Sequence, residues 1–323
     1  MPNVIKYTTG TTPTGCLRKG NMLIGNNTAD YGATFYNGIN PPSGGYTIYL
    51  NKASGGPSIY CPTNEAQLIA ITKQISGTAY SNAAQCLDYY ASQTDKICVN
   101  FNYEGIVTNG LVLNLDAGFR PSYSSTGTTW YDLSGNANNT TLVNGPTFNS
   151  ANSGSLIFDG VDDYCNISTT QMTSNIITIT GFIKWITSNS RMFFGFTTYD
   201  VWTASNTLGY NTGNGDVYGI SSATVSSLGL VGNWVYYTFV MTSTGSIPAN
   251  NKLYINGNLQ TLSQQLSTTG NAPGFGSTLK LCDWVNGGYY GNMQYGNLQI
   301  YNKELTQAEI TQNFNAQRGR FGI

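Results

Sequence analysis

The chain is long, weakly charged and rich in glycine, and these properties limit what it can do. Its 323 residues exceed the usual size of one domain, so we expect two domains. Only 9% of the residues are charged and the formal net charge is -1, so a nucleic-acid partner is not expected. The absence of histidine excludes a Ser-His-Asp triad and a histidine-ligated metal. The 38 glycines and 13% aromatic residues indicate a folded β protein with many turns.

The start of the chain and its cysteines predict synthesis in the cytoplasm. Residues 1–20 lack the apolar segment of a secretory signal, and no apolar run reaches the length of about 18 residues that spans a membrane. The six cysteines show no CxxC spacing, which predicts reduced thiols rather than disulfides or a zinc site. They are Cys16, Cys61, Cys86, Cys98, Cys165 and Cys282.

The first part of the chain, residues 1–105, is predicted to form a small α+β domain. Residues 44–53 and 57–62 alternate like strands and are joined by a glycine-rich turn. Thr63 or Asn64 then begins a helix with an apolar stripe that runs to Ile75. A second helix is expected after Ser81, and a strand over residues 96–103. The boundary to the next domain is placed between residues 102 and 109, where composition and periodicity change.

Residues 106–323 are predicted to form a β-sandwich, because short apolar strands recur between Gly, Asn and Ser turns. Asn256-Gly257 predicts a tight hairpin, since both central residues of a type I′ turn need positive φ. One helix is expected in this domain, after Leu305, with Thr306 and Glu309 as a capping box. The expected strands are 156–158, 176–185, 191–196, 216–220, 234–242, 252–255, 278–282 and 298–301.

Three segments of this second domain carry a family resemblance. They are SLIFDGVDDYCNI (155–167), WVYYTFVMTSTGSIPANNKLYINGNLQ (234–260) and GNMQYGNLQIYNKELTQAEI (291–310). Their order and spacing resemble the laminin-G-like, concanavalin A-like jelly roll of bacterial and phage surface proteins, and LVLNLDAG (111–118) and TITGFIKW (178–185) fit the same pattern. The resemblance covers residues 106–318. The segment 25–62 resembles N-terminal modules of phage fibre and virion proteins.

Two groups of side chains are candidate binding residues. Asp162 and Asp163 in the acidic string offer oxygen ligands for Ca²⁺, which organises ligand binding at the sandwich rim in laminin-G-like relatives; the alternative is a tight turn with local hydrogen bonds. Aromatic rings in loops would stack on sugar rings or contact a neighbouring subunit. The candidates are Tyr199, Trp202, Tyr210, Trp284, Tyr289 and Tyr290, whereas Trp130, Trp185 and Trp234 are expected in the core.

The resemblance implies a virion surface protein, made in the host cytoplasm, that serves as a fibre, capsid decoration or receptor-binding component. Its expected partners are other virion proteins, host surface glycans or receptors, and further copies of itself, with no required cofactor and no membrane. An enzyme is not expected, because the ExDxxE pattern of glucanases on this fold is absent. The alternatives are a bacterial carbohydrate-binding or adhesion module and a glycan depolymerase.

Overall fold

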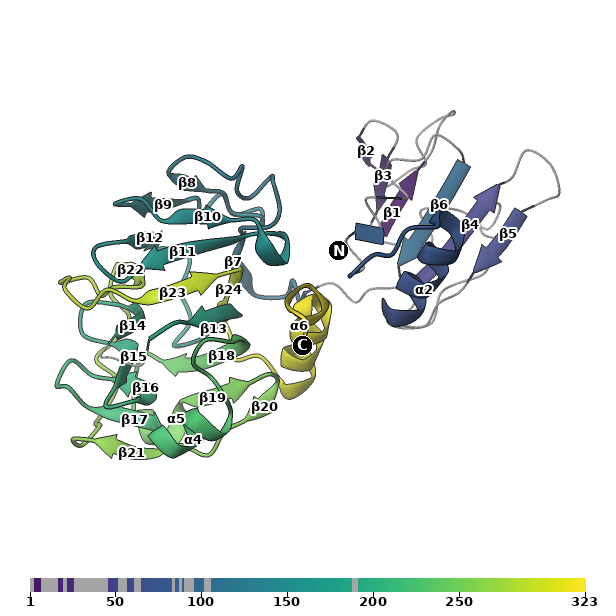
Figure 1. Ribbon diagram of the computed structural model, residues 1–323. Coiled ribbons are helices and arrows are strands. Elements are labelled where there is room, and N and C mark those ends of the chain that lie inside the picture. Colours follow the sequence, from purple (N-terminus) through teal and green to yellow (C-terminus); the bar gives the residue numbers. More distant parts are fainter. Residues whose placement is uncertain are drawn as a thin grey trace. The chain divides into compact units, whose positions relative to one another are not determined.

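The chain forms two compact units, described here from a computed structural model (Figure 1). The structure describes residues 3–6, 17–19, 22–25, 46–51, 57–60, 65–82, 85–86, 89, 96–101, 106–187 and 191–323. The first unit comprises Met1–Ile106 with Asn315–Ile323, and the second Val107–Phe314. The division after Ile106 lies within the segment where the sequence predicts a boundary. The terminal residues 315–323, expected with the sandwich, are grouped with the first unit.

The first unit contains a six-stranded antiparallel sheet with the order β2-β3-β1-β6-β4-β5. Its strands are β1 (Asn3–Lys6), β2 (Leu17–Lys19), β3 (Met22–Gly25), β4 (Tyr46–Asn51), β5 (Pro57–Tyr60) and β6 (Lys96–Phe101). Helix α2 (Glu65–Ser76) begins where the sequence predicts it and buries Leu68 and Thr72. Most of the expected second helix, and the segment 26–45, lie outside the described residues. The combination of strands and helix is the expected α+β composition.

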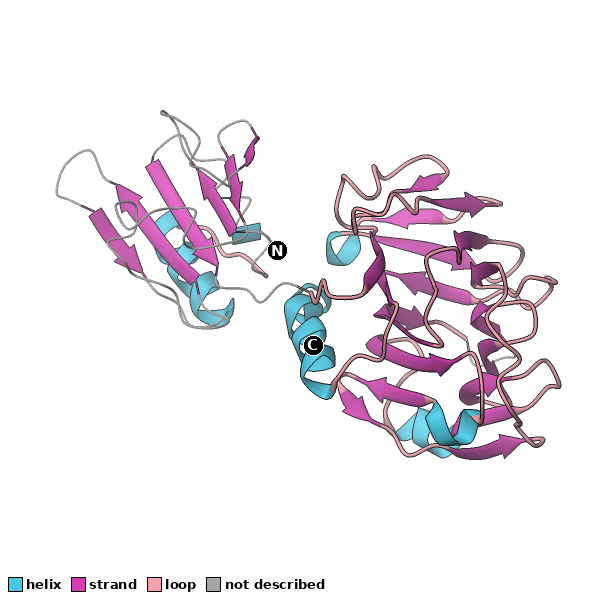
Figure 2. Cartoon of the chain, turned by 180° about the vertical axis from the view of Figure 1, so that it is seen from behind, coloured by secondary structure: helices cyan, strands magenta, loops and turns pink. Residues whose placement is uncertain are grey.

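The second unit is a sandwich of two nine-stranded antiparallel sheets, seen as facing layers in Figure 2. The first sheet follows the order β10-β11-β23-β13-β18-β19-β20, and β24 pairs with both β13 and β7. Its strands are β7 (Leu111–Asp116), β10 (Thr147–Asn149), β11 (Ser155–Asp159), β13 (Ile176–Trp185), β18 (Trp234–Thr242), β19 (Lys252–Ile255), β20 (Asn258–Leu259), β23 (Asn292–Tyr295) and β24 (Asn297–Tyr301).

The second sheet follows the order β21-β17-β16-β15-β14-β22-β12-β9-β8. Its strands are β8 (Thr129–Trp130), β9 (Thr140–Val143), β12 (Tyr164–Ser168), β14 (Arg191–Gly195), β15 (Asp200–Ala204), β16 (Thr207–Asn211), β17 (Val217–Ile220), β21 (Ser263–Leu266) and β22 (Thr278–Leu281). The predicted mainly β sandwich is therefore the fold of this unit. Strands β15 and β16 lie where the sequence predicted a loop.

Aromatic side chains fill the space between the two sheets. Phe193 of the second sheet meets Tyr237 of the first edge to face, with ring centroids 5.1 Å apart, and Phe194 meets Phe239 in the same way at 5.3 Å. Such pairs contribute about 0.5–1.5 kcal/mol each beyond the burial of their area. Trp130 and Trp185 are fully buried as predicted. Trp234 was expected in the core but is half-buried, with its indole nitrogen donating to Asn152.

The predicted hairpin is present between β19 and β20. Ile255 stands opposite Asn258, and the two residues between them, Asn256 and Gly257, have φ values of 49° and 80°. These positive values are what a type I′ turn requires of both central residues. Local sequence chemistry therefore sets the register of this strand pair.

The second unit also contains short helices that the sequence did not predict. They are η2 (Ala151–Ser153), α4 (Ser222–Ser227) and α5 (Ile247–Asn250), while α6 (Gln307–Gln317) and η3 (Arg318–Phe321) end the chain. The expectation of a single helix in this domain was therefore wrong. Of η2, α4 and α5, only α4 has a side-chain cap, in which Ser221 accepts a hydrogen bond from the Thr224 backbone. Among the described residues, no helix has the length and apolar character needed to cross a bilayer.

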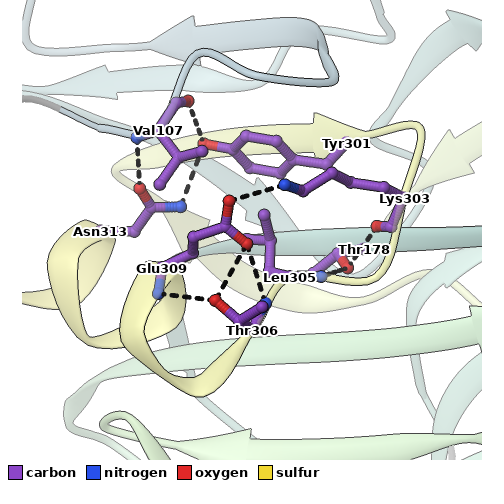
Figure 3. A network of polar contacts seen from close by, with 8 residues as sticks. All are labelled: Val107, Thr178, Tyr301, Lys303, Leu305, Thr306, Glu309 and Asn313. Carbon is purple, nitrogen blue, oxygen red and sulfur yellow. Dashed lines mark hydrogen bonds and ion pairs between the residues drawn. The ribbon is translucent and has the colours of Figure 1, made fainter.

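Helix α6 begins with the predicted capping box and is tied to the sandwich by polar contacts (Figure 3). The backbone nitrogen of Thr306 donates to Glu309 at 2.9 Å, and the backbone nitrogen of Glu309 donates to the Thr306 hydroxyl at 3.3 Å. Asn313 accepts from the backbone of Val107 at 2.7 Å and donates to the Tyr301 hydroxyl at 3.0 Å. The helix thereby connects the first residues of the second unit to its last strand.

Candidate ligand-binding face

A second apolar cluster lies on the outward face of the second sheet, away from the main core. It contains Met192, Trp202, Ala204 and Val217, and Leu266 and Trp284 pack against it. Side chains alternate between the faces of a strand, so Trp202 points outward while its neighbour Val201 joins the main core. The face is built from β14, β15, β17 and β21, and it is the candidate binding face of the molecule.

The side chain of Trp202 reaches across the sheet from β15 to the start of β17. Trp202 stands opposite Gly209 on β16, and Gly209 stands opposite Gly219 on β17. The indole nitrogen of Trp202 donates to the backbone carbonyl of Asp216, next to the start of β17, at 3.1 Å. A Cβ at Gly209 would lie 2.5 Å from the carbonyl oxygen of Tyr218, and one at Gly219 would clash with the carbonyl oxygen of Leu208, so these glycines allow β16 and β17 to approach closely. Trp202 is only 9% exposed, so other side chains cover it.

The loop between β22 and β23 supplies that cover. Tyr289 contacts Trp202 edge to face at 5.9 Å between ring centroids, and contacts Trp284 in the same way at 6.2 Å. Tyr289 remains 42% exposed, whereas Trp284 is half-buried. We call these three residues, Trp202, Trp284 and Tyr289, the aromatic cap. Only the outer ring of the cap, Tyr289, offers a large surface to a ligand.

Hydrogen bonds fix the loop that carries Trp284 and Tyr289. The Trp284 indole nitrogen donates to the carbonyl of Gly287 at 2.7 Å, and the backbone nitrogen of Met192 donates to the carbonyl of Tyr289 at 3.0 Å. Asp283, at the start of the loop, is buried and paired with Lys280 at 3.1 Å. A loop held at both ends presents its aromatic ring at little cost in conformational entropy on binding.

The structure corrects the expected exposure of three candidate residues. Tyr199, Trp202 and Tyr210 were expected as loop aromatics, but Tyr199 is 0% exposed and Tyr210 1%. The Tyr210 hydroxyl donates to the carbonyl of Lys252 at 2.6 Å, and the Tyr199 hydroxyl accepts from Asn251. Both rings belong to the main core. Burial removes Tyr199 and Tyr210 as stacking surfaces, while Trp202 is the buried member of the aromatic cap, in contact with Tyr289.

The glycines and asparagines around these residues explain the wrong prediction. Gly209 and Asn211 suggested a loop, yet both lie in β16. Gly209 allows the close approach of the β17 backbone, and Asn211 is the hydrogen-bond partner of a buried aspartate. Tyr290 is half-buried beside the cap and keeps its place as a candidate. The structure thus brings together Trp202, Trp284 and Tyr289 and separates them from Tyr199 and Tyr210.

Three aspartates meet at the turn between β11 and β12. Oxygens of Asp159, Asp162 and Asp163 all lie within 4.8 Å of one another. Asp159 was not among the sequence candidates, although it stands in the same acidic string. Asp159 and Asp162 are exposed, and Asp163 is buried. These residues have the oxygen chemistry that Ca²⁺ prefers, and a calcium site here stays a prediction.

Local hydrogen bonds shape the same turn. An Asp163 carboxylate oxygen accepts from the backbone nitrogen of Asp159 at 3.1 Å, and Asp159 accepts from the backbone nitrogen of Val161 at 2.8 Å. Burial raises the pKa of Asp163, and the charges of Asp159 and Asp162 add to that effect, while the backbone donor opposes it. These hydrogen bonds within the turn fit the alternative to a calcium site that the sequence offered, a tight turn with local hydrogen bonds.

Sequence reasoning missed a buried polar group next to the aromatic cap. Asp200 on β15 faces Asn211 on β16, whose amide nitrogen donates to both carboxylate oxygens at 3.2 and 3.0 Å. The oxygen of Asn211 accepts from the backbone nitrogen of Asp216 at 3.2 Å. We call these residues, Asp200, Asn211 and Asp216, the acid-amide chain. The spacing of its residues in the sequence gives no signal, because the contact depends on strand pairing.

No protein-family model matches the sequence, and no curated protein matches it. The chain is similar to a solved receptor-binding domain of botulinum neurotoxin D, with TM-score 0.47, 12% identity, and coverage of 65% of this chain and 53% of that chain. It is also similar to the binding domain of botulinum neurotoxin DC solved with rat synaptotagmin II, with TM-score 0.45, 15% identity, and coverage of 65% and 52%. The match spans about half the length of those chains. At these values, the likeness carries no argument about ligands.

Proposed function

We propose that this chain is a non-catalytic binding protein that uses the aromatic cap to contact a host surface glycan. Tyr289 carries the proposal, because it is a 42% exposed ring that rests edge to face on two tryptophans. A sugar ring stacks on such a surface through its C–H face, and neighbouring amides and hydroxyls bind its hydroxyl groups. Asn286, which is exposed in the same loop, offers its amide oxygen, since its amide nitrogen donates to the carbonyl of Thr197 at 3.2 Å.

The charge of the molecule supports a neutral ligand. The formal net charge is -1, and the acid nearest the cap in sequence, Asp283, is already paired with Lys280. Stacking and neutral hydrogen bonds depend little on ionic strength, since salt screens mainly charge interactions. Binding at the cap is therefore expected to persist in high salt. A contact with a protein receptor that relies on ion pairs would weaken there.

The proposal places the binding protein on the surface of a virion. Support comes from the segments 155–167, 234–260 and 291–310, which resemble jelly rolls of phage and bacterial surface proteins. The first unit would attach the chain to other virion proteins, and the sandwich would face the host. Further copies of the chain would raise the strength of attachment by multivalency. Detection of the chain in purified particles by mass spectrometry, and its density on the particle surface, would test this placement.

Binding of the full-length protein to host cells tests the role of the cap. Tyr289→Ala removes the exposed ring, and an anchor of this type contributes about 2 kcal/mol, or about thirtyfold in affinity. Tyr131→Ala is a matched control, since Tyr131 is 48% exposed and lies outside the cap. We expect a large loss of binding for Tyr289→Ala and none for Tyr131→Ala, at both low and high salt.

The same assay separates the alternatives. Equal binding by both variants would place the ligand site elsewhere. Reducing ends that the protein releases from host polysaccharide would identify a depolymerase and contradict a purely binding role. Periodate oxidation of the vicinal diols in host surface glycans should abolish binding, and binding that survives this treatment would indicate a protein receptor.

A further inference from the structure

Among the described residues, no cation forms an ion pair with the two buried aspartates below the aromatic cap. Asp200 and Asp216 are each 0% exposed. Three ion pairs join acids to lysines in the described part of the chain, and neither aspartate takes part in them. One oxygen of Asp216 accepts from the backbone and hydroxyl of Thr212, but the other is buried without a hydrogen-bond donor. Two enclosed negative charges without compensation would be costly.

The groups around Asp200 do not supply a positive charge. Asn211 contacts it from β16, and Gly195 stands opposite it on β14. From the β22–β23 loop, Trp284 packs over Gly195 next to Asp200. The titratable neighbours are Asp216 and Tyr199, and both interact with Asp200 electrostatically.

The cationic side chains of the adjoining strands β14 and β22 do not pair with Asp200. Lys280 of β22 is paired with Asp283, and Arg191 of β14 stands opposite Thr203 rather than Asp200. Within the described part of the chain, Asp200 therefore has a hydrogen bond from one amide and electrostatic interactions with one acid and one phenol, but no ion pair with a cation.

We propose that Asp200 carries a proton in the native fold and that the acid-amide chain is a proton-linked latch for the aromatic cap. The latch acts through Asp216, whose backbone carbonyl accepts the indole hydrogen of Trp202 at 3.1 Å. When Asp200 releases its proton to solvent, a second charge forms next to that of Asp216. Repulsion then separates the ends of β15 and β16 from the loop 212–216. Trp202 loses its anchor, and Tyr289 loses the ring on which it rests.

The direction of the pH dependence follows from the surroundings of Asp200. Burial raises its pKa well above the ordinary value, the charge of Asp216 adds to this, and the hydrogen bond from Asn211 opposes it. An unfolded aspartate titrates near about 3.9. The stabilisation of the fold by protonated Asp200 is therefore complete below about pH 3.9. It is lost as the pH rises through the raised pKa that Asp200 has in the folded protein. Within this window the unfolding equilibrium constant rises about tenfold per pH unit for the one proton.

Infrared spectroscopy of the full-length protein with ¹³C-labelled aspartate measures the proton directly. We expect the carbonyl band of a protonated carboxyl group at neutral pH, and its absence in Asp200→Asn. Asp283→Asn is the matched control, because Asp283 is buried in the same region but has a lysine partner. The band should persist in this control. In the wild-type protein, the unfolding equilibrium constant should rise about tenfold per pH unit within the window given above. This dependence on pH should be absent in Asp200→Asn and present in Asp283→Asn.

A second measurement follows the latch in the wild-type protein and does not depend on the folding of Asp200→Asn. The indole N–H resonance of Trp202 in the wild-type protein, assigned with Trp202→Phe, should shift with the same midpoint as the infrared band. Three outcomes would overturn the proposal: no protonated band at neutral pH, a band that remains in Asp200→Asn, or an indole resonance that ignores the titration. Stoichiometric Ca²⁺ binding that both Asp200→Asn and Asp216→Asn abolish would also overturn it, since a cation would then occupy the place of the proton.

Discussion

Replacement of Trp202 separates the support of the aromatic cap from its exposed surface. Trp202→Ala removes an indole that is 91% buried, together with its hydrogen bond to the Asp216 carbonyl. Large-to-small changes of buried aromatic residues cost about 3–5 kcal/mol. Tyr289→Ala removes a ring that is 42% exposed, so we expect its free energy of unfolding to fall by only about 1 kcal/mol. Trp202→Phe keeps an aromatic ring but leaves the Asp216 carbonyl without its donor. We expect this change to lower the free energy of unfolding by about 1–2 kcal/mol.

Tryptophan fluorescence during urea unfolding provides the assay. All five tryptophans lie at or beyond residue 130, so the signal reports on the second unit alone. The predicted order of stability is wild type, Tyr289→Ala, Trp202→Phe and Trp202→Ala. A loss below about 1 kcal/mol for Trp202→Ala would refute the reasoning, because it would show that the site collapses without a cavity or that the indole is not packed. A wild-type denaturant slope in each variant would show that the same surface is exposed on unfolding.

Three further predictions concern parts of the fold away from the cap. Thr306→Ala should cost about 1 kcal/mol in urea unfolding, because it removes the capping oxygen of α6, and an unchanged midpoint would contradict the capping role. Cys165 is a free, buried thiol whose pKa burial raises to about 12, so iodoacetamide at pH 8 should modify it only after unfolding; rapid modification of the native protein would show that it is accessible. Residues 106–323 expressed alone should give one cooperative fluorescence transition, and a fragment that is unfolded beside a folded full chain would place the domain boundary elsewhere.

The sequence predicted those parts of the fold that local chemistry determines. The expected strand 176–185 coincides with β13, Asn256-Gly257 forms the turn it suggested, and Thr306 and Glu309 cap α6 as a reciprocal pair. In each case, the residues that determine the structure are neighbours in the chain. Alternation, turn propensity and capping are therefore sufficient to identify them.

The sequence failed at β15 and β16, where distant residues determine the structure. Asp200 lies in a buried strand, where Asn211 donates to it from the paired strand. Tyr210 is hidden because its hydroxyl reaches the carbonyl of Lys252 in the opposite sheet. Such partners are found only once the strand register is known. The same limit applies to the candidate site: Trp284 and Tyr289 were identified by their loop, but the support from Trp202 was not.

Footprinting of the native protein with hydroxyl radicals tests the central claim most directly. Radicals oxidise exposed aromatic rings, and mass spectrometry compares the modification of Tyr289 and Tyr131 with and without host surface glycan. Both rings are similarly exposed, at 42% and 48%. Binding at the aromatic cap predicts that the glycan protects Tyr289 and leaves Tyr131 unchanged. Equal modification of Tyr289 in the free and the glycan-bound protein would contradict it.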